Sequence, residues 1–141
     1  MDTGTGLSGE LYWLTLTILL SSALWVPYIV NRFWELGPPS FTWFPPATSP
    51  AKAAWAERAI MAHRNAMENL MIFAPLAIMI NLTKSGNAVT ELACMIYFYA
   101  RCGHYLICIF GFPIVVRTLV FLAGVSCQIT LIVSLLTGHQ G

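Results

Sequence analysis

Charged residues are scarce in this chain. Only 9% of its 141 residues are Asp, Glu, Lys or Arg, and the formal net charge is +1. A chain with so little charge has no broad basic face, and this argues against a nucleic-acid partner, because binding to phosphates depends on clustered lysine and arginine. The apolar fraction of 57% lies well above that of soluble domains. The composition therefore argues against a water-soluble fold and makes the lipid bilayer the expected partner.

Paired cysteine motifs are also missing. The chain has four cysteines, all within apolar runs, with no CxxC pair and no clustering with histidine at zinc-ligand spacing: Cys94, Cys102, Cys108 and Cys127. We interpret them as packing residues and expect no bound metal. The first ten residues lack the basic stretch of a signal peptide, so we expect the first apolar run to be kept as a membrane anchor.

Long apolar runs dominate the rest of the sequence. A bilayer core of about 30 Å needs about 20 apolar residues in a helix. Four runs have this length, at residues 11–30, about 53–82, 88–110 and 113–136. The connection at residues 31–52 holds five of the eight prolines and is expected to be a long loop. The sequence thus predicts a single domain over residues 1–141, an all-α integral membrane bundle of four helices.

Two features refine this prediction. Pro27 and Pro75 lie inside predicted helices, where each removes a backbone hydrogen bond and is expected to kink its helix. The sequence GFP at residues 111–113 is expected to end the third helix at its glycine and to open the fourth at its proline. Such short connections make neighbouring helices antiparallel.

The orientation follows from the basic residues near the loops. Arg32, Lys52 and Arg58 flank the first loop, whereas the opposite side offers Lys84 with Glu91 nearby. Because basic residues accumulate on the cytoplasmic side of a membrane protein, the first and third loops are predicted to face the cytoplasm.

The ionisable residues within the predicted spans lie in one half of each helix, the half nearest to the first and third loops. They are Arg58, His63, Arg64 and Glu68 in the second helix, Arg101 and His104 in the third, and Arg117 in the fourth. Such residues are costly in hydrocarbon and usually face the bundle interior. We therefore expect one polar layer near one face of the membrane.

Helical spacing divides this layer into stripes. Glu57, Met61, Arg64 and Glu68 share one stripe of the second helix, Arg58, Asn65 and Asn69 share the adjacent one, and Arg101, His104 and Cys108 share a face of the third helix. If the stripes converge, three arginines and Glu68 surround a cavity suited to a ligand with carboxylates and an ammonium group. The alternative is that Arg64 and Glu68 pair at i, i+4 and the rest make contacts between helices. In both cases Glu68 is expected to contact an arginine.

The residues of this layer carry a family resemblance. ERAIMAHRNAMEN, residues 57–69, resembles E-R-x-x-x-A-H-x-N-x-x-E, the signature of the membrane-associated proteins in eicosanoid and glutathione metabolism, or MAPEG. YARCGHYLICIFGFPIVVRTLVFLAG, residues 99–124, continues the resemblance with an arginine, a histidine and a later arginine in the family's spacing. The resemblance covers the whole chain, and the layout is similar to that of the bacterial branch of the family.

The resemblance implies a homotrimer of four-helix bundles in a bacterial inner membrane, with glutathione as co-substrate bound between subunits near the cytoplasmic face. It implies a glutathione-dependent transferase or peroxidase acting on small lipophilic electrophiles. By carry-over, Arg64, Asn65 and Glu68 would hold the γ-glutamyl end, Arg101 and His104 would line the site, and Arg32 would reach the glycyl carboxylate. Arg117 corresponds to the arginine that stabilises the thiolate, and Thr118 to a hydroxyl that donates a hydrogen bond to the sulfur.

Two positions depart from the family pattern, since Cys108 and Phe121 stand where many glutathione-using members carry tyrosine. A rival interpretation is a non-catalytic member of the same fold that binds lipid or serves as a scaffold. A small multidrug transporter is disfavoured, because that class is expected to carry an acidic residue in its first helix and residues 11–30 contain none.

Overall fold

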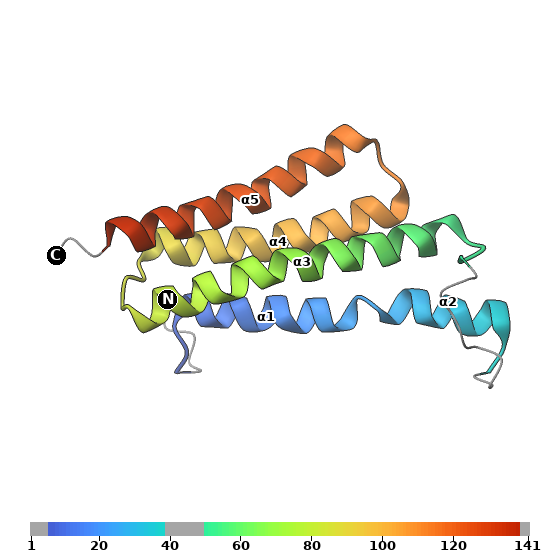
Figure 1. Ribbon diagram of the computed structural model, residues 1–141, viewed down its shortest axis with the longest axis horizontal. Helices are drawn as coiled ribbons and strands as arrows, with labels where there is room; N and C mark the ends of the chain where they lie inside the picture. The colour runs from blue at the N-terminus through green and yellow to red at the C-terminus, as the bar shows by residue number, and fades with distance from the viewer. Residues whose placement is uncertain (1–5, 39–49, 139–141) are drawn as a thin grey trace.

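The computed structural model describes residues 6–38 and 50–138. In these ranges the chain forms five helices: α1 (Gly9–Ala23), α2 (Val26–Leu36), α3 (Ala54–Leu82), α4 (Ala88–Phe110) and α5 (Ile114–Thr137). Helices α1 and α2 follow one another almost in line. Together with α3, α4 and α5 they form long helical segments that lie side by side (Figure 1). The end of α2, the start of α3, the end of α4 and the start of α5 lie together at one end of this bundle (Figure 1).

These helical segments have the length and composition of membrane spans. Within the described residues, four helical segments are long and apolar enough to cross a bilayer: 9–36, 54–82, 88–110 and 114–137. Large apolar side chains such as Leu19, Met71 and Leu136 are exposed on their outer faces, which suits contact with lipid. The chain is therefore a multi-pass membrane protein. The last three helices lie within one residue, at either end, of the ranges expected from the sequence.

The first span differs from the single helix expected at residues 11–30. It begins at Gly9, breaks at Leu24 and Trp25, and continues as α2 to Leu36. Pro27 explains the break, because it has no N–H to donate to the preceding turn but fits the first turn of a new helix. The loop expected at residues 31–52 is correspondingly shorter, since residues 31–36 are helical, and residues 39–49 lie outside the described part. Pro75, by contrast, lies inside α3, which continues through it.

Polar contacts from two other helices hold the chain on either side of the break. The buried hydroxyl of Tyr105 in α4 donates a hydrogen bond of 2.7 Å to the carbonyl oxygen of Leu24. One turn further on, the hydroxyl of Tyr28 is hydrogen-bonded to Nδ1 of His63 in α3, at 2.9 Å. None of the residues of α2 is buried, so polar contacts such as these contribute to keeping α2 against the bundle.

Glu35 joins the last turn of α2 to the start of α3. Its carboxylate accepts hydrogen bonds of 3.1 Å from the backbone N–H groups of both Lys52 and Ala53, and one of 2.8 Å from the side chain of Asn31. Ala53 precedes the first residue of α3 and offers no side-chain cap of its own. Backbone N–H groups at a helix start lack helical acceptors, and Glu35 supplies one from a neighbouring helix.

Alanine lines the packed face of α3. Five alanines of this helix are buried: Ala56, Ala59, Ala62, Ala66 and Ala77. Small residues let helices approach closely, which is the main source of helix association where lipid is as apolar as the side chains. Toward the far end of the bundle, Phe73 of α3 stacks on Tyr97 of α4 with ring centroids 3.8 Å apart. Helices α3 and α4 are central, because each packs against α1, against α5 and against the other.

Local chemistry sets both ends of α4. The side chain of Asn87 accepts hydrogen bonds from the N–H groups of Val89 and Thr90, and the Thr90 hydroxyl accepts one from the N–H of Asn87. At the other end Gly111 takes a φ of 71° and ends α4, and Pro113 precedes α5, as the sequence predicts. The last turn of α4 therefore lies beside the first turn of α5.

Replacing Tyr105 with phenylalanine tests how the break in the first span is held. The variant leaves the Leu24 carbonyl without its donor, and a buried unsatisfied carbonyl costs about 1–3 kcal/mol. We expect a lower midpoint of thermal unfolding in detergent micelles. Tyr99→Phe, at an exposed position of the same helix, is the control and should match the wild type. Equal midpoints for Tyr105→Phe and the wild type would show that the break does not depend on this hydrogen bond.

Candidate functional site

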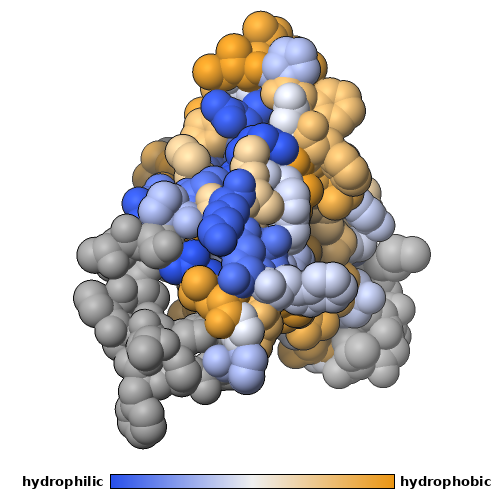
Figure 2. Space-filling view, turned by 90° about the vertical axis from the view of Figure 1, so that its right-hand side faces the viewer, coloured by the Kyte–Doolittle hydropathy of each residue, from blue (hydrophilic) through white to orange (hydrophobic). Residues whose placement is uncertain are grey.

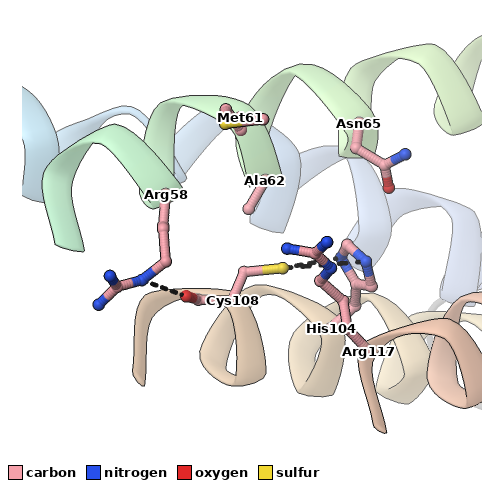
Figure 3. A pocket seen from close by; sticks show the side chains of 7 residues that line it. All are labelled: Arg58, Met61, Ala62, Asn65, His104, Cys108 and Arg117. Carbon is pink, nitrogen blue, oxygen red and sulfur yellow. Dashed lines mark hydrogen bonds between the residues drawn. The ribbon is translucent and has the colours of Figure 1, made fainter. Parts of the chain in front are cut away.

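A cavity of about 220 Å³ lies between α3, α4 and α5, near the end of the bundle where α4 leads into α5 (Figure 3). Its lining residues are Arg58, Met61, Ala62, Asn65, His104, Cys108 and Arg117. A second cavity of about 190 Å³ shares Asn65, His104 and Arg117 with the first and adds Thr118 and Phe121. Seen from this end, hydrophilic residues gather in the middle of the face, with hydrophobic residues above them and to their upper right (Figure 2).

Helical spacing explains how these residues meet. Arg58, Ala62 and Asn65 follow one another at intervals of four and three along α3, so they share one side of that helix. His104 and Cys108 are one turn apart on α4. Arg117 lies in the first turn of α5, and the tight turn at residues 111–113 brings that turn next to the last turn of α4. The cavity therefore depends on three helices and one short connection.

Arg58 is bound to the end of α4. Its Nε donates hydrogen bonds to the carbonyl oxygens of Cys108 and Ile109, at 2.9 and 3.2 Å, and its Nη2 donates a third to Ile109 at 2.8 Å. Carbonyl groups in the last turn of a helix have no helical donor, and a positive charge is favourable there. A Cβ on Gly111 would lie 3.3 Å from this guanidinium, so the glycine also makes room for it. The structure thus gives Arg58 a fixed position in the cavity lining.

Cys108 and His104 form the α4 side of the cavity. Both are more than nine-tenths buried, and the sulfur of Cys108 lies 3.9 Å from each ring nitrogen of His104. The guanidinium of Arg117 lies beside them (Figure 3). The described lining of this cavity contains two guanidiniums, an imidazole and a thiol but no carboxylate. Such a lining attracts a small anion.

Asn65 contributes an unused acceptor. Its side chain points from α3 toward His104 (Figure 3). The side-chain oxygen is buried and has no hydrogen-bond partner in the described part of the chain. Since a buried acceptor without a donor costs free energy, the position suits a ligand that brings an N–H or O–H group.

Arg101 lies deeper, one turn from His104 along α4, and is only 3% exposed. Its guanidinium carbon lies 4.9 Å from the ring centroid of Tyr97 and 5.6 Å from that of Phe121. Its Nη2 approaches the carbonyl oxygen of Phe121 at 3.5 Å, whereas its Nε and Nη1 have no hydrogen-bond partner among the described residues. Cation–π contacts offset part of the cost of burial. Gly124 makes the space, because a Cβ there would overlap the guanidinium.

Arg64, Glu68 and Arg32 lie elsewhere. Arg64 and Glu68 are exposed on α3, and Arg32 lies on α2; none of them is among the residues that line the two cavities. In the part of the chain that the structure describes, no ion pair joins Glu68 to an arginine. The expectation that Glu68 contacts an arginine is therefore wrong within one chain. The physical reason is that the alanine face of α3 turns toward α4, and this leaves the stripe of Arg64 and Glu68 outside.

The sequence places Arg58 and Cys108 on stripes of the expected polar layer, but neither is predicted to bind or to react. Arg58 was assigned to a stripe, but its bonds to the end of α4 depend on residues fifty positions away. Cys108 was interpreted as a packing residue. Its place one helical turn after His104, on the face that also carries Arg101, predicts that it faces the polar layer, but spacing alone does not show that its side chain lines a cavity.

The fold and the site together define a multi-pass helical membrane protein with an arginine-lined cavity near one end of its bundle. The family model described as "MAPEG family" matches residues 11–137, and the chain belongs to this family. This match confirms the resemblance identified in residues 57–69 and 99–124. The chain has no significant match among curated proteins or among solved structures. Family membership indicates a role related to glutathione or eicosanoid metabolism.

Gly124→Ala tests whether the position of the Arg101 guanidinium depends on the absence of a side chain at residue 124. The new methyl group would overlap the guanidinium, and overpacking of this kind costs about 1–3 kcal/mol. We expect a lower midpoint of thermal unfolding. Gly103→Ala is the matched control, because a Cβ there meets only a methyl group of Val120 at 3.9 Å. Alanine is also the better helix former, so this control should be neutral or stabilising. If both variants unfold at the same temperature, Arg101 does not lie against Gly124.

Proposed function

We propose that this protein is a membrane-embedded, glutathione-dependent transferase or peroxidase that acts on lipophilic electrophiles. The observation that carries the proposal is the cavity between α3, α4 and α5, which is lined by Arg58, Arg117 and His104 and has no carboxylate among its described lining residues. The family supplies the ligand class. A cavity of this charge fits an anionic thiol compound better than a neutral lipid.

Glutathione brings two carboxylates, an ammonium group and a thiol, and each has a counterpart near the cavity. Guanidiniums bind carboxylates through paired hydrogen bonds. The unpartnered side-chain oxygen of Asn65 is an acceptor for the ammonium group. His104 lines the cavity, and Arg101 adds positive charge behind it. We assign Asn65, His104 and Arg101 to binding on these grounds.

The proposed binding residues that lie outside the cavity can contact a ligand only if it binds between this subunit and a neighbouring one. Arg64 and Glu68 are exposed on α3, which is long and apolar enough to cross a membrane. Charged groups facing hydrocarbon are costly, and an interface with another copy removes that cost. We therefore propose a homotrimer in which Arg64 and Glu68 act on a ligand bound between subunits. Arg32 of α2 is proposed to reach the glycyl carboxylate.

Arg117 and Thr118 are the proposed catalytic residues. A free thiol with a pKa near 8.5 is mostly protonated at neutral pH, and a nearby guanidinium favours the thiolate, which is the nucleophile. Arg117 lies in the first turn of α5, and Thr118 lines the adjoining cavity, from which its hydroxyl can donate to the sulfur. The thiolate then attacks the electrophilic atom of a lipid-dissolved substrate, and the leaving group departs with the electrons of the broken bond.

The position of the site suits both reactants. It lies near one end of the membrane-spanning helices, within reach of a water-soluble tripeptide and of a substrate dissolved in the bilayer. Arg32, Lys52 and Arg58 belong to segments at this end, and we propose that it faces the cytoplasm of a bacterial cell.

Glutathione binding to the purified protein in detergent tests the proposed function. Isothermal titration should detect binding, and the ultraviolet absorbance of the thiolate should rise on adding glutathione. Arg117→Ala should slow turnover by roughly 10²-fold, as loss of one group that stabilises a developing charge does in other enzymes, and should change affinity less. Arg64→Ala should instead weaken binding.

Lys84→Ala, at the opposite end of the bundle, is the control and should leave binding and turnover unchanged. Absence of glutathione binding to the wild type would overturn the proposed function and favour the non-catalytic role in lipid binding. Unchanged absorbance and turnover in Arg117→Ala would show that Arg117 is structural.

Native mass spectrometry tests the proposed assembly. The wild type should be released from detergent as a homotrimer. Glu68→Ala should weaken the trimer without altering the helix content, because Glu68 contacts no arginine among the described residues of its own chain. A wild type that stays monomeric over a range of protein concentrations would contradict the proposal.

A further inference from the structure

The four cysteines, all free thiols, lie in different surroundings. Cys94 and Cys127 are buried in the apolar core that contains Phe73. Cys102 is half-buried on α4. Cys108 is buried too, but its side chain lines the cavity of the proposed site. A buried thiol that faces a cavity is open to a small reagent that enters there.

We propose that Cys108 is a modification site that forms a reversible mixed disulfide with small anionic disulfides, such as the oxidised form of glutathione. The inference rests on the proposed function in one respect, since the same cavity must admit a small anionic sulfur compound. It does not require that the protein catalyse a reaction of glutathione.

Charge and position around the sulfur support this assignment. The guanidinium of Arg117 lies beside the Cys108 side chain (Figure 3). Arg58 is also near, because its Nε donates a hydrogen bond of 2.9 Å to the carbonyl oxygen of Cys108 itself. Two fixed positive charges raise the local concentration of an anionic reagent and hold its carboxylates next to the thiol. The same charges repel a cationic disulfide of similar intrinsic reactivity.

The exchange balances without another reactant. The Cys108 proton passes to the imidazole of His104, whose nitrogens lie 3.9 Å from the sulfur. The thiolate attacks one sulfur of the incoming disulfide, so that a new S–S bond forms and the old one breaks. The other half leaves as a thiolate with the electron pair of the broken bond. Cys108 is oxidised and the incoming disulfide is reduced. A second thiolate reverses the modification by attacking the mixed disulfide and releasing Cys108.

The modification would close the site. A tripeptide joined to Cys108 occupies the cavity in which Arg117 is proposed to meet the substrate thiol. The ratio of disulfide to thiol in the surroundings would then set the fraction of protein whose cavity is free.

The test compares two disulfides on the purified full-length protein in detergent. Glutathione disulfide is anionic and cystamine is cationic, and each is added at the same concentration. Intact-protein mass spectrometry follows the adduct, and peptide mapping locates it. We expect the anionic disulfide to modify Cys108 roughly 10-fold faster than cystamine or more, as electrostatic attraction raises encounter rates. Arg117→Gln should reduce this ratio.

Cys102 provides the matched control on the same helix. Cys102→Ser should keep the anionic adduct and Cys108→Ser should lose it, while peptide mapping of the wild type gives the same answer without a variant. An adduct on Cys102 in place of Cys108, no adduct at all, or equal rates with both disulfides would overturn the inference. If reduced glutathione binds but Cys108 stays unmodified, the inference fails alone. If Cys108 is modified but reduced glutathione does not bind, the proposed function fails alone.

Discussion

Charged side chains within membrane-spanning helices need polar partners, and this constraint organises the cavity end of the bundle. Arg58 satisfies it with carbonyl groups in the last turn of α4, and in doing so joins α3 to α4 where the cavity forms. Arg101 satisfies it in part through cation–π contacts with two aromatic rings. Gly124 has no side chain and leaves the space that the Arg101 guanidinium occupies. The remaining charges line the cavity or face outward. A binding site and a stable bundle thus draw on the same side chains.

Different kinds of residues lie between the helices in the two halves of the bundle. In one half, Phe73 and Tyr97 stack within an apolar core, and α4 begins at a capping box that fixes its first turn. In the other half, alanines keep α3 close to α4 while polar residues between the helices leave cavities.

The sequence predicts most of this fold, because bilayer thickness fixes the length of a span and local caps fix its ends. Helices α3, α4 and α5 illustrate this, with Asn87, Gly111 and Pro113 at their boundaries. The continuation of the first span as α2 could not be predicted in the same way. Its Asn31 and Arg32 resemble loop residues, and it is held by Tyr105, His63 and Glu35, whose partners lie far away in the sequence. In the site, spacing groups residues into stripes but does not tell which stripe faces inward. The alanines of α3 decide this, and they turn Asn65 toward the cavity and Arg64 away from it.

The first span, like the 29-residue α3, is longer than the hydrocarbon core of a bilayer requires, and this has a consequence for how the protein lies in the membrane. At 1.5 Å per residue, the 28 residues from Gly9 to Leu36 measure about 42 Å, against a hydrocarbon thickness of about 30 Å. The 85% exposed Trp34, near the end of α2, is a side chain that is favourable at the level of the lipid headgroups. Tilt of the span or extension of α2 into the headgroup layer takes up this excess, so the orientation of α2 depends on the thickness of the host membrane.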